Sequence, residues 1–287
     1  MSLVEQKRIL VLIDDELVLE QTDEEKVINH IVFFSSGKAS WMAAKQVANK
    51  FGTDNLWLVF ADTGIEDPDN YRFLEDAAKD VGGQLVKLKD GRTPWDVFRQ
   101  KRFVNHRQSH CSIELKVKPC EAWVFENLSY DNAILYFGID FNEIDRMTKI
   151  AENWQPFRVE SPLCWGDKWI DRQEIDRQLQ LNGLKQPRLY DLGFSHANCG
   201  GFCPKAGLKH YKNLLEKLPE VYAHHEAEEQ KFRDELGNHS IGLLRRTKNG
   251  LKQSITLKQF REEIESQPVQ LSLDFEALGG CGCFIDG

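Results

Sequence analysis

Residues 31–45 read IVFFSSGKASWMAAK, and this change from apolar to small to helical residues constrains the fold most. The run at 31–34 predicts a buried strand, residues 35–37 a turn, and the apolar residues spaced three or four apart after Lys38 a helix. The start of a helix directs free amides and the positive end of its dipole toward the preceding turn. Small residues let a phosphate approach the backbone, and Lys38 adds a cation. The stretch predicts an anion site, with an ordinary strand-to-helix connection as the alternative.

The region that follows alternates predicted strands and helices, which indicates an α/β fold. We expect a parallel twisted sheet with helices on both faces, plus a helical, cysteine-containing C-terminal region. Strands are predicted at 31–34, 56–61, 84–88 and 133–137, and helices at 38–50, 68–81, 94–102 and 114–127. Ligands bind at the carboxyl ends of such strands. The turns at 35–38 and 62–64 are therefore expected to face one pocket.

Three regions are predicted from these patterns. Residues 1–29 form an N-terminal extension with a candidate hairpin around 14–16, residues 30–160 an α/β domain, and residues 161–287 a helical region with cysteine-rich loops and tail. Helices in the last region are predicted at 165–181, 205–217, 219–236 and 252–266, with a loop at 191–204.

Composition narrows the class of protein. A chain of 287 residues with 41% hydrophobic and 29% charged residues can bury a large core. It contains no run of 18 apolar residues, and its N-terminus lacks the pattern of a signal peptide, so no membrane association and a cytoplasmic location are expected. The formal net charge of −8 argues against a surface coated in positive charge for nucleic acid.

A local basic groove is nevertheless compatible with that charge. Cations and histidines gather between residues 99 and 118 and again between 245 and 252: Arg99, Lys101, Arg102, His106, Arg107, His110, Lys116, Lys118, Arg245, Arg246, Lys248 and Lys252. Phe103 and Trp123 would be placed to stack on bases in such a groove. A solvated helix face is the alternative.

The cysteines form a second candidate site. Seven cysteines without a secretion signal indicate thiols, metal ligands or redox chemistry rather than structural disulfides. Cys199 and Cys203 lie in one glycine-rich loop and Cys281 and Cys283 in another, and neighbouring glycines allow thiolates to converge on zinc or an iron–sulfur cluster. The spacing does not choose between these metals, and thiols in flexible loops are the alternative. Cys120 and Cys164 lie among apolar residues and are expected in the core.

Several of these segments together resemble a known family. The loop SSGKAS at 35–40, followed by FADTGIEDPDNYRF at 60–73, resembles the PP-loop family of adenine-nucleotide alpha hydrolases, and more closely its phosphoadenosine phosphosulfate (PAPS) reductase-like branch. The resemblance continues in four further segments: CSIELKVKP at 111–119, YFGIDFNEIDRM at 136–147, SPLCW at 161–165 and CGGFCPKAG at 199–207. It implies a PP-loop type of sheet that binds ATP, or PAPS, with Mg²⁺.

The resemblance also implies roles for individual residues. Catalytic roles fall to Lys38, Asp62 and Cys111. Nucleotide contacts are implied for Ser35, Ser36, Gly37, Lys38, Ser40, Asp62, Thr63, Gly64, Gly138 and Arg146, with Glu143 in the same motif as Arg146. The family loop usually reads Ser-Gly-Gly-x-Asp-Ser, whereas this chain has Ser36 for the first Gly and Ala39 for the Asp. The missing carboxylate leaves open whether the α–β phosphate bond is cleaved.

Three functions are compatible with these features. The first is an adenylating enzyme that transfers sulfur to a nucleic acid (tRNA or DNA) or a small molecule, with a sulfur-donor protein as a further partner. Four of Cys111, Cys199, Cys203, Cys281 and Cys283 would hold a 4Fe–4S cluster, with zinc as the second choice. The second is a PAPS reductase, although the tail GGCGCF lacks the histidine that usually follows the reductase cysteine. The third is a non-catalytic nucleotide sensor, which Ala39 favours. The sequence leaves the oligomeric state open.

Overall fold

The centre of the molecule is a five-stranded parallel sheet. A computed structural model describes residues 5–13, 16–24, 27–104, 110–167, 169–248 and 251–266. The sheet has the order β5-β4-β3-β6-β7, and all four of its strand pairs are parallel. Its strands are β3 (Asn29–Phe33), β4 (Leu56–Asp62), β5 (Gln84–Lys89), β6 (Ala133–Tyr136) and β7 (Arg158–Glu160). The predicted α/β class is confirmed, and β7, a three-residue edge strand, is an addition to it.

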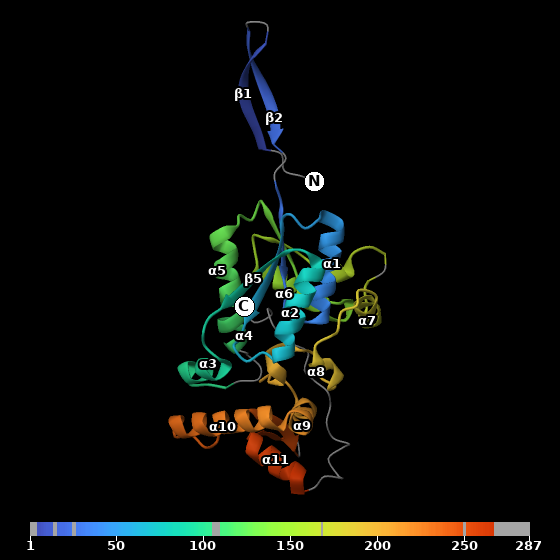
Figure 1. The fold of residues 1–287 in the computed structure, drawn as a ribbon. Coiled ribbons are helices and arrows are strands. Elements are labelled where there is room, and N and C mark those ends of the chain that lie inside the picture. The colour runs from blue at the N-terminus through green and yellow to red at the C-terminus, as the bar shows by residue number, and fades with distance from the viewer. Residues whose placement is uncertain are drawn as a thin grey trace.

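Helices cover both faces of this sheet (Figure 1). The helices α1 (Lys38–Phe51), α2 (Pro68–Val81) and α7 (Arg172–Leu181) share one apolar cluster with β3 and β4. The helices α5 (Lys118–Asn127) and α6 (Asp145–Asn153) frame the cluster on the other face, which includes the fully buried Cys120. Burial raises the pKa of the Cys120 thiol, so this cysteine is a core residue, as expected.

A third apolar cluster unites the C-terminal helices with α3. Its elements are α3 (Pro94–Lys101), α8 (Arg188–Asp191), α9 (Leu208–Lys217), α10 (Pro219–Leu236), β8 (Leu244–Lys248), β9 (Leu251–Ile255) and α11 (Leu257–Ser266). Figure 1 shows α9, α10 and α11 together at one end of the molecule, beyond α3 and α8. The helix α3, which follows β5 in the chain, thus packs with the C-terminal helices. The predicted boundary at residue 160 assigns this helix to the α/β domain instead.

Two predicted helices are wrong in part. The helix predicted at 165–181 begins only at Arg172, because Asp171 accepts the amide of Glu174 as its N-cap, and Gly166 upstream has a φ of +76°. The helix predicted at 252–266 is strand β9 followed by α11, whose first turn is capped by Thr256 accepting the amide of Gln259. In both cases a short polar side chain starts the helix later than the apolar spacing suggests.

The remaining elements are an N-terminal hairpin and several short helical turns. The predicted N-terminal hairpin is present as β1 (Glu5–Ile13) and β2 (Glu16–Glu24), which pair antiparallel from Ile13↔Glu16 to Glu5↔Glu24. One-turn elements are α4 (His110–Ser112), the π-helical η1 (Ile113–Val117), and the 3₁₀ turns η2 (Phe141–Glu143), η3 (Pro162–Cys164) and η4 (Asn198–Gly201). The last of these lies inside the predicted loop at 191–204.

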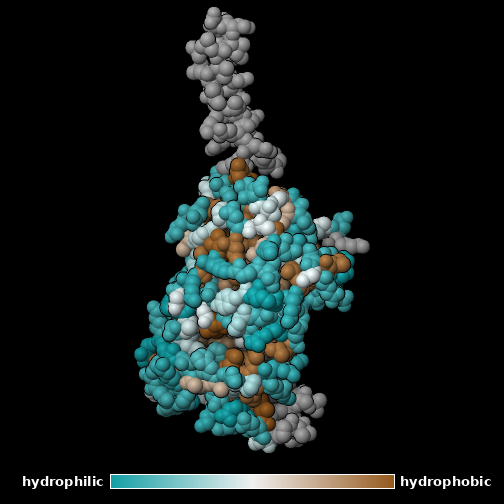
Figure 2. Space-filling view, viewed as in Figure 1, coloured by the Kyte–Doolittle hydropathy of each residue, from teal (hydrophilic) through white to brown (hydrophobic). Residues whose placement is uncertain are grey.

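The surface is predominantly hydrophilic on the face shown in Figure 2, where apolar residues are visible mainly as small groups among hydrophilic ones. Within the described ranges, no helix is both long enough and apolar enough to span a membrane.

Candidate functional site

A cleft of about 850 Å³ opens where β3 and β6 end. Its walls come from the turn after β3, the segment after β6, the helix α7 and residues 186–213. Seven residues implied by the family resemblance line it: Ser35, Gly37, Lys38, Ser40, Gly138, Glu143 and Arg146. The carboxyl ends of these parallel strands and the start of α1 meet in this cleft, which is the expected position for a ligand in an open α/β sheet.

The turn before α1 has the features of an anion site. Ser40 Oγ donates to the carbonyl of Gly37 at 2.9 Å, which folds the turn back on the helix. Gly37 is the N-cap of α1, and the described structure contains no side-chain cap for the helix's first amides. Ser36 has a φ of +56°, and within the described chain its buried Oγ has no hydrogen-bond partner. Uncapped amides at the start of a helix fit an anionic oxygen. Ser36 itself is fully buried and is not among the described residues that line the cleft.

Lys38 is held by residues that no sequence motif indicated. Its Nζ lies 2.5 Å from Asp176 Oδ1 of α7 and 3.0 Å from Gln186 Oε1. It also lies 4.4 Å from the centre of the Tyr190 ring, a distance typical of a cation–π contact. All three partners follow residue 170, so only the tertiary structure brings them to the loop.

Gly138, in the segment after β6, packs closely against the first turn of α1. A Cβ built on Gly138 would lie 2.8 Å from Ala39 C and from Ser40 N. Both are backbone atoms, so only glycine fits without a shift of the loop. Arg146 donates to Glu143 at 2.6 Å, and both line the cleft. Glu143 and Arg146 therefore form the i,i+3 ion pair and also lie in the cleft, so the two interpretations of this motif are compatible.

The turn at 62–64 is separated from this cleft. Asp62 Oδ1 accepts the amide of Gly64 and the hydroxyl of Tyr71, each at 2.8 Å, which is the geometry of a capped turn. Neither Asp62 nor Gly64 is among the described residues that line the cleft, and Thr63 lines a different cavity. The role of Asp62 at Mg²⁺ or ribose stays a prediction.

Three predicted metal ligands converge on that second cavity. Cys111, Cys199 and Cys203 line a cavity of about 30 Å³, room for about one water. Cys199 has a φ of +56°, and a side chain on Gly200 would collide with the carbonyl oxygen of Ile65. Such close packing covers the turn after β4 and places the cysteine loop over it. Cys164 lies elsewhere, half-buried, with its thiol 3.7 Å from the carbonyl of Ile139.

The thiols are the donors that zinc or an iron–sulfur cluster takes. Within the described ranges, however, no group of three or more histidine, cysteine, aspartate or glutamate side chains is arranged as a metal site. Cys281 and Cys283 lie outside the described residues. The metal centre therefore stays a prediction, for which the structure describes three of the five candidate ligands.

A buried ion pair supports the cysteine loop. Glu66 accepts the backbone amide of Cys199 at 2.5 Å and the hydroxyl of Thr63 at 3.0 Å, and Lys116 Nζ lies 4.0 Å away. Burial raises the pKa of Glu66, while Lys116 opposes that rise. Lys116 lines the cysteine cavity from η1. Its prediction as a cation of an open groove is wrong, because its side chain is only 7% exposed.

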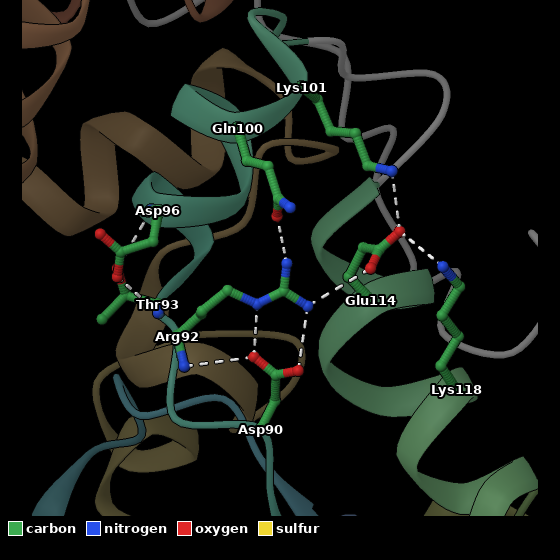
Figure 3. Close-up of polar contacts among 8 residues, drawn as sticks. All are labelled: Asp90, Arg92, Thr93, Asp96, Gln100, Lys101, Glu114 and Lys118. Atoms are coloured by element: carbon green, nitrogen blue, oxygen red, sulfur yellow. Dashed lines mark hydrogen bonds and ion pairs between the residues drawn. The ribbon is translucent and has the colours of Figure 1, made fainter.

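Four other cations of the predicted groove are paired with carboxylates: Arg99, Lys101, Lys118 and Arg246. Figure 3 shows Lys101 and Lys118 directed at Glu114, at 2.9 and 2.8 Å, and Arg92 directed at the same carboxylate at 3.3 Å. The hydrogen bond from Lys118, followed by those from Lys101 and Arg92, lowers the pKa of Glu114 to about 2.

Two further arginines of the predicted groove are also paired with carboxylates. Arg99 pairs with Glu228 and Glu235, and Arg246 with Glu263. Trp123 is partly buried and packs against Trp57, whereas Phe103 is 42% exposed. His106 and Arg107 lie outside the described residues. This arrangement favours the alternative of a solvated, ion-paired surface.

His196 connects the two cavities. Its ring lines both the large cleft and the cysteine cavity, as does Asn198. Burial, with a smaller contribution from His210, lowers the pKa of His196 to about 3, so its ring is neutral at physiological pH. His210 stacks on it with ring centres 5.5 Å apart. Sequence reasoning missed His196, His210 and Asn198, although the unusual segment SHANCGGFC was the signal that could have drawn attention to them.

Comparisons with known proteins give distant similarities. No family model matches the chain. Two uncharacterized proteins of Methanocaldococcus jannaschii match it, one at 23% identity over 74% of this chain and 43% of the relative. The other matches at 26% identity over 66% of this chain and 44% of the relative. The chain thus spans less than half the length of these curated relatives.

Two solved structures also resemble the chain. A phosphoadenylyl-sulfate (PAPS) reductase from Candida auris, in a phosphate complex, has a TM-score of 0.40 at 16% identity, covering 59% of this chain and 79% of that one. An NH3-dependent NAD synthetase from Campylobacter jejuni subsp. jejuni, in complex with nitrate, has a TM-score of 0.38 at 10% identity, covering 73% and 83%.

Proposed function

We propose that this chain is a PP-loop enzyme of the PAPS reductase-like branch that binds an adenine nucleotide in the large cleft. One observation carries the proposal. The uncapped start of α1 opens into an 850 Å³ cleft that also contains Lys38 and Arg146. Backbone amides and two cations around one hollow are suited to a chain of phosphates.

The reaction that fits best is adenylation followed by sulfur transfer. An oxygen of the acceptor attacks the α-phosphorus, the bond from that phosphorus to the β-phosphate oxygen breaks, and pyrophosphate leaves. A sulfur nucleophile then attacks the adenylated carbon, and AMP leaves with the acceptor's oxygen. Lys38 and Arg146 would stabilise the charge that develops on the phosphates. Asp140, a buried carboxylate of the cleft wall, is our candidate for contact with Mg²⁺ in place of the aspartate absent at position 39.

The cysteine cavity would hold the sulfur or its metal centre. Cys111, Cys199 and Cys203 supply thiols there, and the cavity of about 30 Å³ would admit a single zinc ion but not an iron–sulfur cluster without a shift of the surrounding loops. Glu66 holds the Cys199 backbone in place for that purpose. The acceptor belongs to the class of carbonyl-bearing heterocycles or small molecules, free or within a nucleic acid, and a sulfur-donor protein would reload the site.

A second candidate function is reduction of PAPS. The shared wall of the two cavities favours it, since His196 and Asn198 alone among the described lining residues belong to both. A cysteine thiolate would attack the sulfur of the sulfate, the bond from that sulfur to the phosphate oxygen would break, and adenosine bisphosphate would leave. A thiol reductant would then displace sulfite from the resulting thiosulfonate and form a disulfide.

Replacing Lys38 by alanine tests the phosphate site. We expect the affinity of anaerobically purified protein for Mg·ATP to decrease about 10- to 30-fold, because a charge-assisted contact of about 1.5–2 kcal/mol is lost. Calorimetry measures the affinity. Lys45→Ala is the matched control, since Lys45 lies about two turns farther along α1, does not line the cleft and pairs with Asp80 at 3.3 Å. Equal affinity of Lys38→Ala and the parent would contradict the assignment.

The products separate the three functions. Release of pyrophosphate from Mg·ATP in the presence of an acceptor supports adenylation. Sulfite formed from PAPS and dithiothreitol supports the reductase. Tight binding of ATP with neither product supports a nucleotide sensor, and absence of any nucleotide binding would overturn the proposed function.

Removing Asp176, the partner of Lys38, should strengthen the binding of Mg·ATP, whereas removing Lys38 should weaken it. Asp176 is 49% exposed on its side chain, so its ion pair with Lys38 contributes less than about 1 kcal/mol. Asp176→Asn frees Lys38 to turn to a phosphate, and we expect Mg·ATP to bind up to about fivefold more tightly. Glu174→Gln is the control. Glu174 lies on the same helix, and among the described residues its side chain pairs only with Arg177 and Gln178. Weaker binding by Asp176→Asn would show instead that this carboxylate serves the nucleotide or its metal ion.

A further inference from the structure

His196 is unusual among the buried histidines. It is 9% exposed, and among the described residues neither of its ring nitrogens has a hydrogen-bond partner. The other two buried histidines that the structure describes are satisfied: His225 Nδ1 accepts from Trp95 Nε1 at 2.9 Å, and His30 Nδ1 lies 2.9 Å from the Tyr136 hydroxyl. A buried polar group without a partner is costly and rare, and it calls for an explanation such as a ligand.

The position of the ring indicates where that ligand lies. His196 contributes to the wall of the large cleft, which contains the uncapped amides of α1, and to the wall of the cavity that Cys111, Cys199 and Cys203 line. The wall that separates the phosphate cleft from the thiols is therefore formed by this ring together with Asn198. The ring is held in place, because His210 stacks on it and is itself fixed by donating from Nε2 to the carbonyl of Gly201 at 2.7 Å.

The chemistry of the ring selects the kind of ligand atom. A neutral imidazole presents one N–H donor and one nitrogen acceptor. The donor is suited to an oxygen of the substrate at the reacting end, whether a carbonyl oxygen of an acceptor or a sulfate oxygen of PAPS. It adds no positive charge, in contrast with the cations Lys38 and Arg146 at the phosphate end.

We propose that His196 is a substrate-binding residue that hydrogen-bonds an oxygen at the reacting end of the nucleotide-linked substrate and holds it where the cleft adjoins the cysteines. The inference rests on the proposed nucleotide site in the cleft, and it applies to adenylation and to PAPS reduction alike. In both reactions the atom that meets sulfur is attached to this oxygen.

The test observes the ring itself. Full-length protein is labelled with ¹⁵N-histidine and kept anaerobic, and the His196 ring signals are assigned by their absence in His196→Gln. We expect the ring ¹⁵N shifts of His196 to change when PAPS is added, since its sulfate reaches beyond the phosphate site. Methyl methanethiosulfonate, a small thiol-modifying reagent, should shift the same signals from the cysteine side, and dithiothreitol should reverse that change.

His225 is the control in the same spectrum, because it is buried and hydrogen-bonded and lines neither cavity. Its ring shifts should stay constant throughout. Calorimetry on the same sample reports whether PAPS and Mg·AMP-PNP bind at all. Binding of PAPS with unchanged His196 shifts would overturn the His196 proposal and leave the nucleotide site standing.

Two other outcomes also overturn it. Absence of binding by both nucleotides removes the proposed function and the His196 contact with it. A His196 shift with Zn²⁺ alone, and none with PAPS, would assign the ring to a metal centre instead. All binding measurements in this test use the wild-type protein. Only the assignment of the His196 signals requires a folded variant, His196→Gln.

Discussion

Alanine at Gly138 is expected to abolish nucleotide binding. Its Cβ would lie 2.8 Å from backbone atoms of both Ala39 and Ser40, closer than Cβ contacts in folded proteins allow. Neither neighbour is the end of a flexible side chain, so the loop itself must shift. The same backbone forms the proposed phosphate site, and small displacements of preorganised donors are expensive. We expect the affinity for Mg·ATP to decrease at least about 100-fold, which corresponds to ~3 kcal/mol.

Calorimetry measures that affinity, and thermal unfolding shows whether the variant is folded. Gly91→Ala is the matched control: a Cβ there meets nothing within 4 Å, although its φ of +96° makes the substitution strained. This control removes a glycine without touching the cleft, and it should bind Mg·ATP as the parent does. Parent-like affinity in a folded Gly138→Ala would refute the role of the loop backbone.

Alanine at Glu229 is expected to destabilise the C-terminal region strongly. Glu229 is 2% exposed, and its two oxygens accept the amides of Leu243 and Leu257, each at 2.6 Å. One side chain of α10 thus anchors the start of the β8–β9 hairpin and the start of α11. Loss of both acceptors leaves two buried amides unsatisfied and costs about 4 kcal/mol. Urea unfolding measures the loss, with the exposed Glu220→Ala on the same helix as a control expected to change little.

The same residue predicts a pH dependence. Burial raises the pKa of Glu229 to about 7, against the opposing effect of the two backbone amides. Because the folded chain holds this proton more tightly than the unfolded chain, the contribution of Glu229 to stability is largest below pH 4.5. It decreases by up to ~3 kcal/mol as the pH rises through 7.

Glu229→Gln isolates this contribution, since glutamine does not titrate and keeps one acceptor oxygen. The difference in free energy of unfolding between the parent and Glu229→Gln should therefore favour the parent more at pH 5 than at pH 8. A difference independent of pH would show that the carboxyl is not titrating in this range.

Much of the fold follows from short-range patterns. The apolar run at 31–34, the turn with Gly37 and the helix after Lys38 are local features, and the structure has β3 and α1 there. Asp67 and Pro68 predicted the start of α2, and the side chain of Asp67 caps it. Local prediction fails where a single capping residue sets the start of a helix, as Asp171 and Thr256 do. It also fails where an edge strand such as β7 is too short to show a pattern.

The candidate site divides in the same way. The sequence alone determined the strand–turn–helix, because it depends on residues adjacent in the chain. The roles of the loop residues at a phosphate and of the cysteines at a metal stay predictions. Only the tertiary structure decided that Asp176, Gln186 and Tyr190 hold Lys38, and that His196 belongs to both cavities. It also placed the 62–64 turn beneath the cysteine loop rather than in the cleft. These pairings join positions more than 100 residues apart through packing between helices, and no local periodicity records such contacts.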